Sequence, residues 1–446
     1  MNPLAFSVSS RWLVLSLITA TPSAAPAADL VLKKAPPLTV RQAPAYPENL
    51  ARYHFGADVH AAPQSVPLTR LQPSSNGQDQ NMSEAALLCD DPTTGYELPA
   101  GVSSLSISLS TIENIESVCF LNSGAQGDFE IAISDADLPT TSPVWRSSGK
   151  GSLTSGPVAI KIGPGEAKYL KIKFNLTRAG RIAAFGVYAT PALSDFTMPR
   201  PRKVSFEESS PNFALINFNF SDLHLKARGL YASSGDLEQI SNMIDDQAAT
   251  AYQFAKDDAE PTAVIDLGRE RSLSRLCALY AEQPGMLEFY VLRDLPNGAS
   301  SQASDVRQVA NVGQSAGLPS SLEITDQTLA GFERVGSVVN RGEGRASINF
   351  PEVAGRYLML KWHPANGQAS AFSIAQVAAF GPTKQSATGR NAEDGKDGFD
   401  GKSILDKEGP EALGEGEAQP PGEGPPPSLP PVPPFTFIPQ APPTSP

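Results

Sequence analysis

Short apolar runs that alternate with polar residues limit the folds open to this chain more than any other feature of its sequence. Four of them lie between residues 104 and 176: SLSISLS, DFEIAIS, PVAIKIG and KYLKIKFNL. A period of two places successive side chains on opposite faces of a β-strand. Helical spacing is scarce, and residues 236–244 offer one short candidate. We therefore expect many short strands that form a β-sandwich or barrel.

A second strand-rich region repeats the first. Its candidate strands are TAVIDLG, SRLCALYA, LEFYVLRD, ASINF and RYLMLKW, between residues 262 and 362. At a constant offset of 158 residues, identical residues align, among them Ile107 with Ile265, Cys119 with Cys277, and Gly127 with Gly285. Because the chain has only three cysteines, a cysteine match at this offset favours an internal duplication into two domains over chance.

The N-terminus has the pattern of an export signal. Arg11 precedes a short apolar run at 12–20, and the small residues Ala25 and Ala27 suit cleavage by signal peptidase. No later stretch reaches the roughly 20 apolar residues of a membrane-spanning helix. We expect a secreted protein, located in the periplasm or at the cell surface, with no transmembrane segment.

Composition separates the expected domains from their flanks. Residues 28–70 are rich in Pro and Ala, and 13 of the last 27 residues are Pro, so both flanks are expected to be disordered. The predicted segments are a signal peptide at 1–27, a leader at 28–70, a first sandwich at 71–192, a linker at 193–221, a second sandwich at 222–383 and an acidic, then Pro-rich tail at 384–446. The Pro-rich tail is a candidate site for a protein partner.

Charge argues against nucleic acid as a partner. The chain carries a formal net charge of −12, and no basic stripe with interleaved aromatic residues is visible. Ten acidic and four basic residues lie between Arg390 and Glu423, so half of the negative excess belongs to the tail. The remaining chain is close to neutral.

The order of motifs in the second region resembles the discoidin, or coagulation factor 5/8 type C, domain family. Ser-Ser at 233–234, Ile-Asp at 244–245, Thr250, Ile-Asp-Leu-Gly at 265–268 and the late strand YLMLKW follow one another as in that family. The first region matches it more weakly. The resemblance implies two tandem jelly-roll β-sandwiches of the galactose-binding-like class, an all-β fold whose loops bind sugars, lipids or proteins.

An acidic pair recurs at the same place in each region, as Asp90-Asp91 and as Asp245-Asp246. The resemblance implies a structural calcium here, with Asp245, Asp246 and Thr250 as ligands. The family's calcium sites also use a carboxylate from the last strand, where this chain has Gln376 and Ala184. The alternative is that an aspartate of each pair closes a turn by hydrogen bonding to its own backbone.

The three cysteines, at 89, 119 and 277, do not form a complete disulfide framework. Cys89 and Cys119 could pair, which would leave Cys277 single. The alignment places Cys119 opposite Cys277, and Cys89 opposite Ile244. We therefore favour three buried thiols that act as small apolar side chains.

Aromatic residues near loops are the candidate ligand contacts, because sugars and apolar groups bind to exposed rings. We assign Asp245, Asp246, Tyr252 and Trp362 to a binding site in the second domain, and Trp145, in a turn-rich stretch, to an exposed platform in the first. Tyr96 and Tyr252 occupy matching places, so an alternative is that both are core residues.

Catalysis is not predicted. The four histidines lack the spacing of a zinc site, and neither a nucleophile elbow nor a phosphate-binding loop is present. We expect a secreted, non-catalytic protein that binds carbohydrate or another extracellular surface ligand. The alternative is a structural or assembly component of the cell envelope or of an extracellular complex.

Overall fold

A computed structural model describes residues 30–62, 84–191, 200, 218–296, 318–365 and 371–382 of the chain. The predicted signal peptide, most of the linker and the acidic and Pro-rich tail lie outside the described residues. Both sheets lie within one compact unit. Among the described residues, no helix is both long and apolar enough to cross a membrane.

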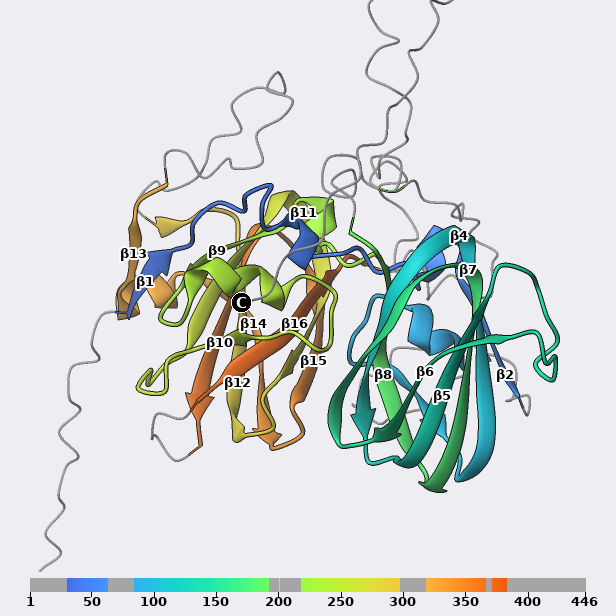
Figure 1. The fold of residues 1–446 in the computed structure, drawn as a ribbon. Coiled ribbons are helices and arrows are strands. Elements are labelled where there is room, and N and C mark those ends of the chain that lie inside the picture. Colours follow the sequence, from blue (N-terminus) through green and yellow to red (C-terminus); the bar gives the residue numbers. More distant parts are fainter. Residues whose placement is uncertain are drawn as a thin grey trace, which may run out of the picture. The chain divides into compact units, whose positions relative to one another are not determined.

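Within the described residues, the first sandwich has seven antiparallel strands in the order β3-β8-β4-β7-β5-β6, with β2 paired to β4 (Figure 1). The strands are β2 (Asp58–Ala62), β3 (Gly95–Leu98), β4 (Gly101–Ser123), β5 (Gln126–Ser134), β6 (Arg146–Leu153), β7 (Gly156–Arg178) and β8 (Gly180–Ala189). Register shifts in the long pair β4–β7, between Ser108 and Glu113, bend both strands around one apolar core. A short 3-10 helix, η3 (Glu84–Leu88), precedes β3.

In the part of the second sandwich that the structure describes, nine antiparallel strands are present. Seven follow the order β13-β1-β9-β11-β15-β12-β14, while β16 pairs with β10 and β11. The strands are β1 (Leu30–Lys34), β9 (Arg228–Ala232), β10 (Tyr252–Gln253), β11 (Thr262–Tyr280), β12 (Pro284–Leu292), β13 (Ser321–Ile324), β14 (Glu333–Arg341), β15 (Arg345–Pro364) and β16 (Ser373–Phe380). The expected short helix is the 3-10 helix η6 (Leu237–Met243), and a second short helix, α2 (Asp326–Ala330), follows β13. These sheets confirm the all-β sandwich prediction.

The two sandwiches share one topology, as the duplication predicts. In the first, β4 pairs with β7 and β8; in the second, β11 pairs with β15 and β16. Cys119 on β4 is opposite Ala159 and Gly186, and Cys277 on β11 is opposite Ser347 and Ala378. The matched cysteines therefore hold equivalent positions on equivalent strands.

The prediction of an unstructured leader at 28–70 is wrong for residues 30–62. Strand β1 lies between β13 and β9 in the second sheet, and β2 pairs with β4 in the first. Leu32 is fully buried in a cluster that covers one face of the second sheet. The leader is rich in Pro and Ala, but its few large apolar residues are placed with strand periodicity, and their burial offsets the cost of ordering the chain.

The first copy of the repeat also begins earlier than residue 71. Residues 48–62 match residues 218–232: Asn49 corresponds to Asn219, and His54 to His224. A short 3-10 helix follows each asparagine, η2 (Tyr53–Phe55) in the first copy and η5 (Leu223–Leu225) in the second. Both end on a residue in the left-handed region, Gly56 at φ 85° and Lys226 at φ 73°. Each asparagine side chain accepts a hydrogen bond from a backbone amide of the last strand of its own sandwich.

Candidate functional site

Asp245, in the acidic pair of the second sandwich, closes a turn. It follows η6 and is fully buried. Its carboxylate accepts hydrogen bonds from the backbone amide of Gln247 (3.1 Å) and from Oγ1 of Thr250 (2.7 Å). Burial raises the pKa of Asp245 well above its usual range, although these two hydrogen bonds oppose the rise. The turn-closing alternative therefore describes Asp245.

Asp246, the next residue, points to the first sandwich. Its backbone is in the left-handed region, at φ 56°, which turns its carboxylate away from that of Asp245. Arg52, from the segment before β2, donates hydrogen bonds to both carboxylate oxygens, with its Nε at 2.7 Å. Tyr188 on β8 donates its hydroxyl to the backbone oxygen of Asp246 (2.7 Å). This geometry forms a two-pronged ion pair between the two sandwiches.

Arg52 is almost completely enclosed, with 3% of its side chain exposed. It also lies 3.7 Å from Asp90 and donates to the carbonyl oxygens of Cys89 and Phe185. Burial opposes its charge, but Asp246 raises the pKa of Arg52 above its already high value. The guanidinium is therefore a fixed, fully bonded cation at the second acidic pair.

The acidic pair of the first sandwich makes the reciprocal contact. Asp91 accepts hydrogen bonds from Arg275 on β11, with Nε at 3.1 Å, and from Oγ1 of Thr93 (2.6 Å). Burial opposes the charge of Asp91, but Arg275 and Thr93 lower the pKa of its carboxyl. Asp90 accepts the backbone amide of Asn219 in the second sandwich (3.0 Å). Each acidic pair is thus a contact between sandwiches.

The matched cysteines lie at these same contacts. Cys119 packs against Tyr188 and against Ala248, which follows the second acidic pair. Cys277 lies close to Asp91 of the first pair and to Thr93. All three cysteines of the chain are unpaired and buried, which confirms the buried-thiol prediction. Burial raises the pKa of the Cys119 thiol to about 11, so it stays protonated and apolar at neutral pH.

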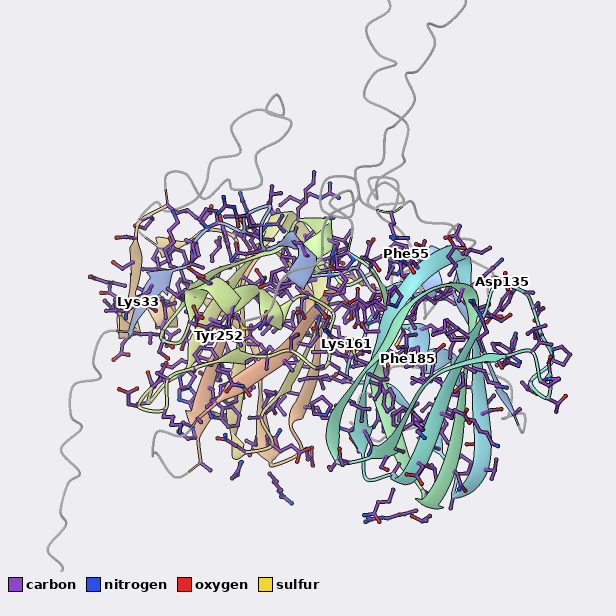
Figure 2. The ribbon with its side chains drawn as sticks, viewed as in Figure 1. Lys33, Phe55, Asp135, Lys161, Phe185 and Tyr252 are labelled. Carbon is purple, nitrogen blue, oxygen red and sulfur yellow. The ribbon has the colours of Figure 1, made fainter. Side chains whose placement is uncertain are left out.

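Two predicted ligand-binding aromatics belong to the core, and this corrects their assignment. Tyr252, labelled in Figure 2, lies on β10 of the second sandwich. It is fully buried, and its hydroxyl donates to the backbone oxygen of Ser234. Trp362 is 1% exposed and stacks on Phe372, with ring centroids 4.5 Å apart and planes within 8°. Tyr96 is buried as well, so the core alternative for the matched tyrosines is confirmed. Neither Tyr252 nor Trp362 offers a face to a ligand.

Trp145 is the one predicted aromatic contact that stays partly accessible. It lies at the end of the loop between β5 and β6 and is half-buried. Its indole nitrogen donates to the carbonyl oxygen of Pro139 (2.9 Å), and the ammonium of Lys171 lies 4.9 Å from the ring centroid. Its role in ligand binding stays a prediction.

The acidic pair of the second sandwich does not form a shared oxygen site. Asp245 bonds to Gln247 and Thr250, whereas Asp246 bonds to Arg52, which supplies the positive charge. Within the described ranges, no group of three or more His, Cys, Asp or Glu side chains is arranged to hold a metal ion. The assignment of calcium to Asp245, Asp246 and Thr250 stays a prediction that this geometry does not support.

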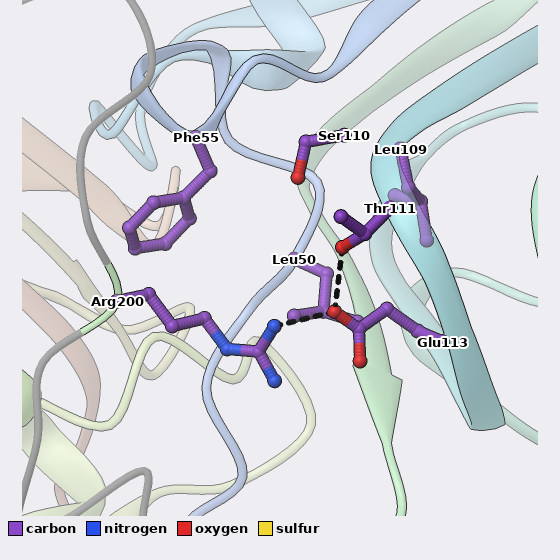
Figure 3. Close-up of a pocket in the computed structure, with 7 residues that line it drawn as sticks. All are labelled: Leu50, Phe55, Leu109, Ser110, Thr111, Glu113 and Arg200. Carbon is purple, nitrogen blue, oxygen red and sulfur yellow. Dashed lines mark hydrogen bonds and ion pairs between the residues drawn. The ribbon is translucent and has the colours of Figure 1, made fainter. Parts of the chain in front are cut away.

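A pocket of about 190 Å³ opens in the first sandwich, at residues that the sequence analysis did not single out (Figure 3). Its apolar lining comes from Leu50, Phe55 and Leu109, and its polar lining from Ser110, Thr111, Glu113 and Arg200. Residues 109–113 form the bend of β4, Leu50 and Phe55 belong to the segment assigned to the leader, and Arg200 to the segment assigned to the linker. The repeat of residues 48–62 at 218–232 was the signal that would have placed Leu50 and Phe55 in the fold.

Charged groups of both signs line this pocket. Arg200 Nη1 lies 2.6 Å from Glu113 Oε1, and its Nε lies 3.0 Å from Oε2 of Glu48. Thr111 Oγ1 donates to Glu113 Oε1 (2.9 Å), as drawn in Figure 3. Glu48 is buried, whereas Arg200 and Glu113 are partly exposed. The pocket therefore combines an aromatic wall with fixed hydrogen-bond donors and acceptors.

No protein-family model matches the chain, and no curated protein matches it. Among solved structures, similar chains include a fucolectin from striped bass (Morone saxatilis) serum, at 11% identity over 75% of this chain and 98% of that one, with a TM-score of 0.25. The CBM32-1 and CBM32-2 domains of Clostridium perfringens ZmpB, in complex with GalNAc, match at 12% identity over 73% and 90%, with a TM-score of 0.24.

A Ruminococcus gnavus GH29 fucosidase in complex with fucose matches at 15% identity over 32% of this chain, with a TM-score of 0.25. The chain spans 27% of that enzyme's length. These neighbours include lectins and carbohydrate-binding modules. The two sheets themselves carry the all-β sandwich fold that the resemblance to discoidin-like, galactose-binding-like domains implies.

Proposed function

We propose that the chain is a secreted, non-catalytic protein that binds carbohydrate or another extracellular surface ligand, and that its site is the pocket of the first sandwich. The pocket lined by Phe55, Glu113 and Arg200 is the observation that carries the proposal. In the site predicted in the second sandwich, Tyr252 and Trp362 are core residues and Asp246 is bonded to Arg52.

The lining suits one sugar ring. An aromatic face such as that of Phe55 contacts the apolar C–H face of a sugar, while carboxylate and guanidinium groups exchange hydrogen bonds with its hydroxyls. The volume of about 190 Å³ is below the roughly 300 Å³ at which sites for drug-sized ligands begin. We expect a terminal or single sugar unit rather than a long stretch of polysaccharide.

Binding fits this pocket better than hydrolysis. Most glycosidases place two carboxyl groups on either side of the scissile bond, one of them as a proton donor. Here the two carboxylates of Glu48 and Glu113 are both engaged by the guanidinium of Arg200. That arrangement favours recognition of hydroxyls. The predicted export to the periplasm or cell surface would bring the pocket to extracellular glycans.

A blocking substitution tests the site. Thr111 is exposed at the rim, so Thr111→Trp fills the pocket with little effect on the core, and Thr111→Ser is the matched control. On a glycan array probed with the mature chain, we expect Thr111→Trp to lower binding about 10-fold or more, with an unchanged Tm. Thr111→Ser should bind as the natural chain does.

Two results would overturn the proposal. Full binding by Thr111→Trp, with binding lost in Trp145→Ala, would move the site to the β5–β6 loop. Absence of any bound glycan, with and without calcium, would favour the structural or assembly role.

A further inference from the structure

The wall of the pocket and the ion pair between the sandwiches share one short segment. Leu50 and Phe55 line the pocket, and Arg52 lies between them in the chain. The side chain of Arg52 bonds to Asp246 of the second sandwich, while its backbone oxygen accepts the amides of Phe55 (3.0 Å) and Ala57 (3.3 Å). Arg52 therefore links the pocket wall to the second sandwich directly. We call residues 50–57 the wall segment.

Both sandwiches hold the wall segment. From the first sandwich, the carbonyl oxygen of Val187 accepts the amide of Leu50 (2.8 Å). From the second, Asp246 binds Arg52, and the ring of Phe218 lies edge-on to that of His54, with centroids 5.0 Å apart. The end of the segment nearest Phe55 thus depends on partners from the second sandwich.

We infer that Asp246 is a positioning residue for the ligand pocket, acting through Arg52 from the other sandwich. Without this carboxylate, a buried guanidinium keeps only the more distant Asp90 as a counter-ion, 3.7 Å away. An enclosed cation with a weakened partner is costly, so Arg52 shifts towards the remaining acceptors or water. Phe55, bonded to the backbone of Arg52, shifts with it. The effect on ligand binding rests on the proposed function, whereas the effect of Asp246 on the wall segment does not.

The reciprocal contact supplies a matched control. Asp91 and Arg275 form the same kind of ion pair between the same two sandwiches. Neither residue lines the pocket or belongs to the wall segment. Asp91→Asn and Asp246→Asn therefore remove the same charge from equivalent contacts, and only one of them touches Arg52. Asparagine also accepts the left-handed backbone conformation of residue 246.

Amide hydrogen exchange of the whole chain tests the inference without a ligand. We expect Asp246→Asn to speed exchange about 10-fold at Phe55, Gly56 and Ala57, whose amides donate within the wall segment. Asp91→Asn should leave these three amides unchanged. Should Asp246→Asn fail to fold, Arg52→Lys keeps the charge, loses the two-pronged geometry and should accelerate the same amides.

Equal exchange at these amides in both aspartate variants, or acceleration confined to residues 245–250, would overturn the inference. The glycan array then separates the two proposals. If a glycan binds the natural chain, Asp246→Asn should weaken it roughly 5-fold or more and Asp91→Asn should not. If no glycan binds, the proposed function fails, while the exchange data still decide the role of Asp246.

Discussion

The outer faces of the two sheets differ at equivalent positions. In the first sandwich, Ser106, Lys171 and Ala132 lie side by side across β4, β7 and β5. In the second, the row across β11, β15 and β12 is Val264, Met359 and Tyr290. The apolar row belongs to a buried cluster that includes Leu32 of β1. A sheet that is apolar on both faces needs a third layer, and the start of the chain provides it.

The two sandwiches also differ in what covers them and in where a pocket opens. The second sandwich buries its outer face under β1 and β13, and its Asp246 binds Arg52. The first sandwich leaves its outer face polar and keeps the pocket of about 190 Å³. Under the proposed function, the first sandwich is the binding domain and the second supports it.

The largest effect is expected from Leu32→Ala. Leu32 is fully buried between β13 and β9, so its truncation should lower the free energy of unfolding by about 2–5 kcal/mol. Lys33→Ala, one residue on and exposed, is the control and should change stability little. Urea unfolding measures both. Equal stability of the two variants would mean that β1 does not cover the second sheet.

The next largest effect should come from Arg275→Met. This change leaves Asp91 without its cation in a mostly buried site. Because both side chains keep some exposure, we expect a loss of about 2–3 kcal/mol, at the lower end for breaking a buried pair. Arg334→Met is the control, because Arg334 is exposed although it pairs with Glu288. If both variants lower the free energy of unfolding equally, the contact between Arg275 and Asp91 stabilises the protein no more than an exposed ion pair does.

His224 gives the second sandwich a dependence on pH. Burial opposes its charge, but Asp222 raises the pKa of His224 to about 9, and its Nε2 bonds to the backbone oxygen of Tyr46 (3.0 Å). Because the folded pKa exceeds the unfolded value of about 6.5, protonation stabilises the fold fully below pH 6.5. That stabilisation is lost as the pH rises towards 9.

We therefore expect stability to fall by about 2 kcal/mol between pH 6.5 and 9.5, and His224→Gln to flatten this part of the profile. Thermal unfolding at a series of pH values measures it. A slope that persists in His224→Gln would assign the effect to another group.

Calcium should have the smallest effect on thermal stability. The positive charge of Arg52 already balances the negative charge of Asp246, and the carboxylate of Asp245 accepts a hydrogen bond from Thr250. We expect the Tm of the natural chain to change by less than about 1 °C between millimolar calcium and a chelator. A rise of several degrees would restore the predicted calcium site.

The sequence predicted the parts of this structure that local patterns encode. Alternation with period two located strands β4, β5 and β7, and the offset of 158 residues placed Cys119 and Cys277 on equivalent strands. The tendency of aspartate to hydrogen-bond to its own backbone in turns also predicted the role of Asp245. Each of these features depends on residues close together in the chain.

The missed features depend on partners far apart in the chain. Asp246 and Arg52 are separated by 194 residues, and no local pattern marks them as a pair. The strand at Leu32 has too few residues to stand out within a Pro- and Ala-rich segment. The apolar run FYVL in β12 was a signal that would have indicated a sheet buried on both faces. Trp362 was expected where a strand meets a loop, because it follows YLMLK and precedes HPANGQ, yet β15 continues to Pro364.

A double-mutant cycle on Arg52 and Asp246 tests the central claim, that the second acidic pair joins the sandwiches rather than binding a ligand. The variants are Arg52→Met, Asp246→Asn and the double mutant, compared by urea unfolding of the whole chain. For a buried two-pronged ion pair, we predict a coupling energy of about 2 kcal/mol or more. A coupling energy near zero, together with loss of glycan binding in Asp246→Asn alone, would contradict the claim and return Asp246 to a ligand site.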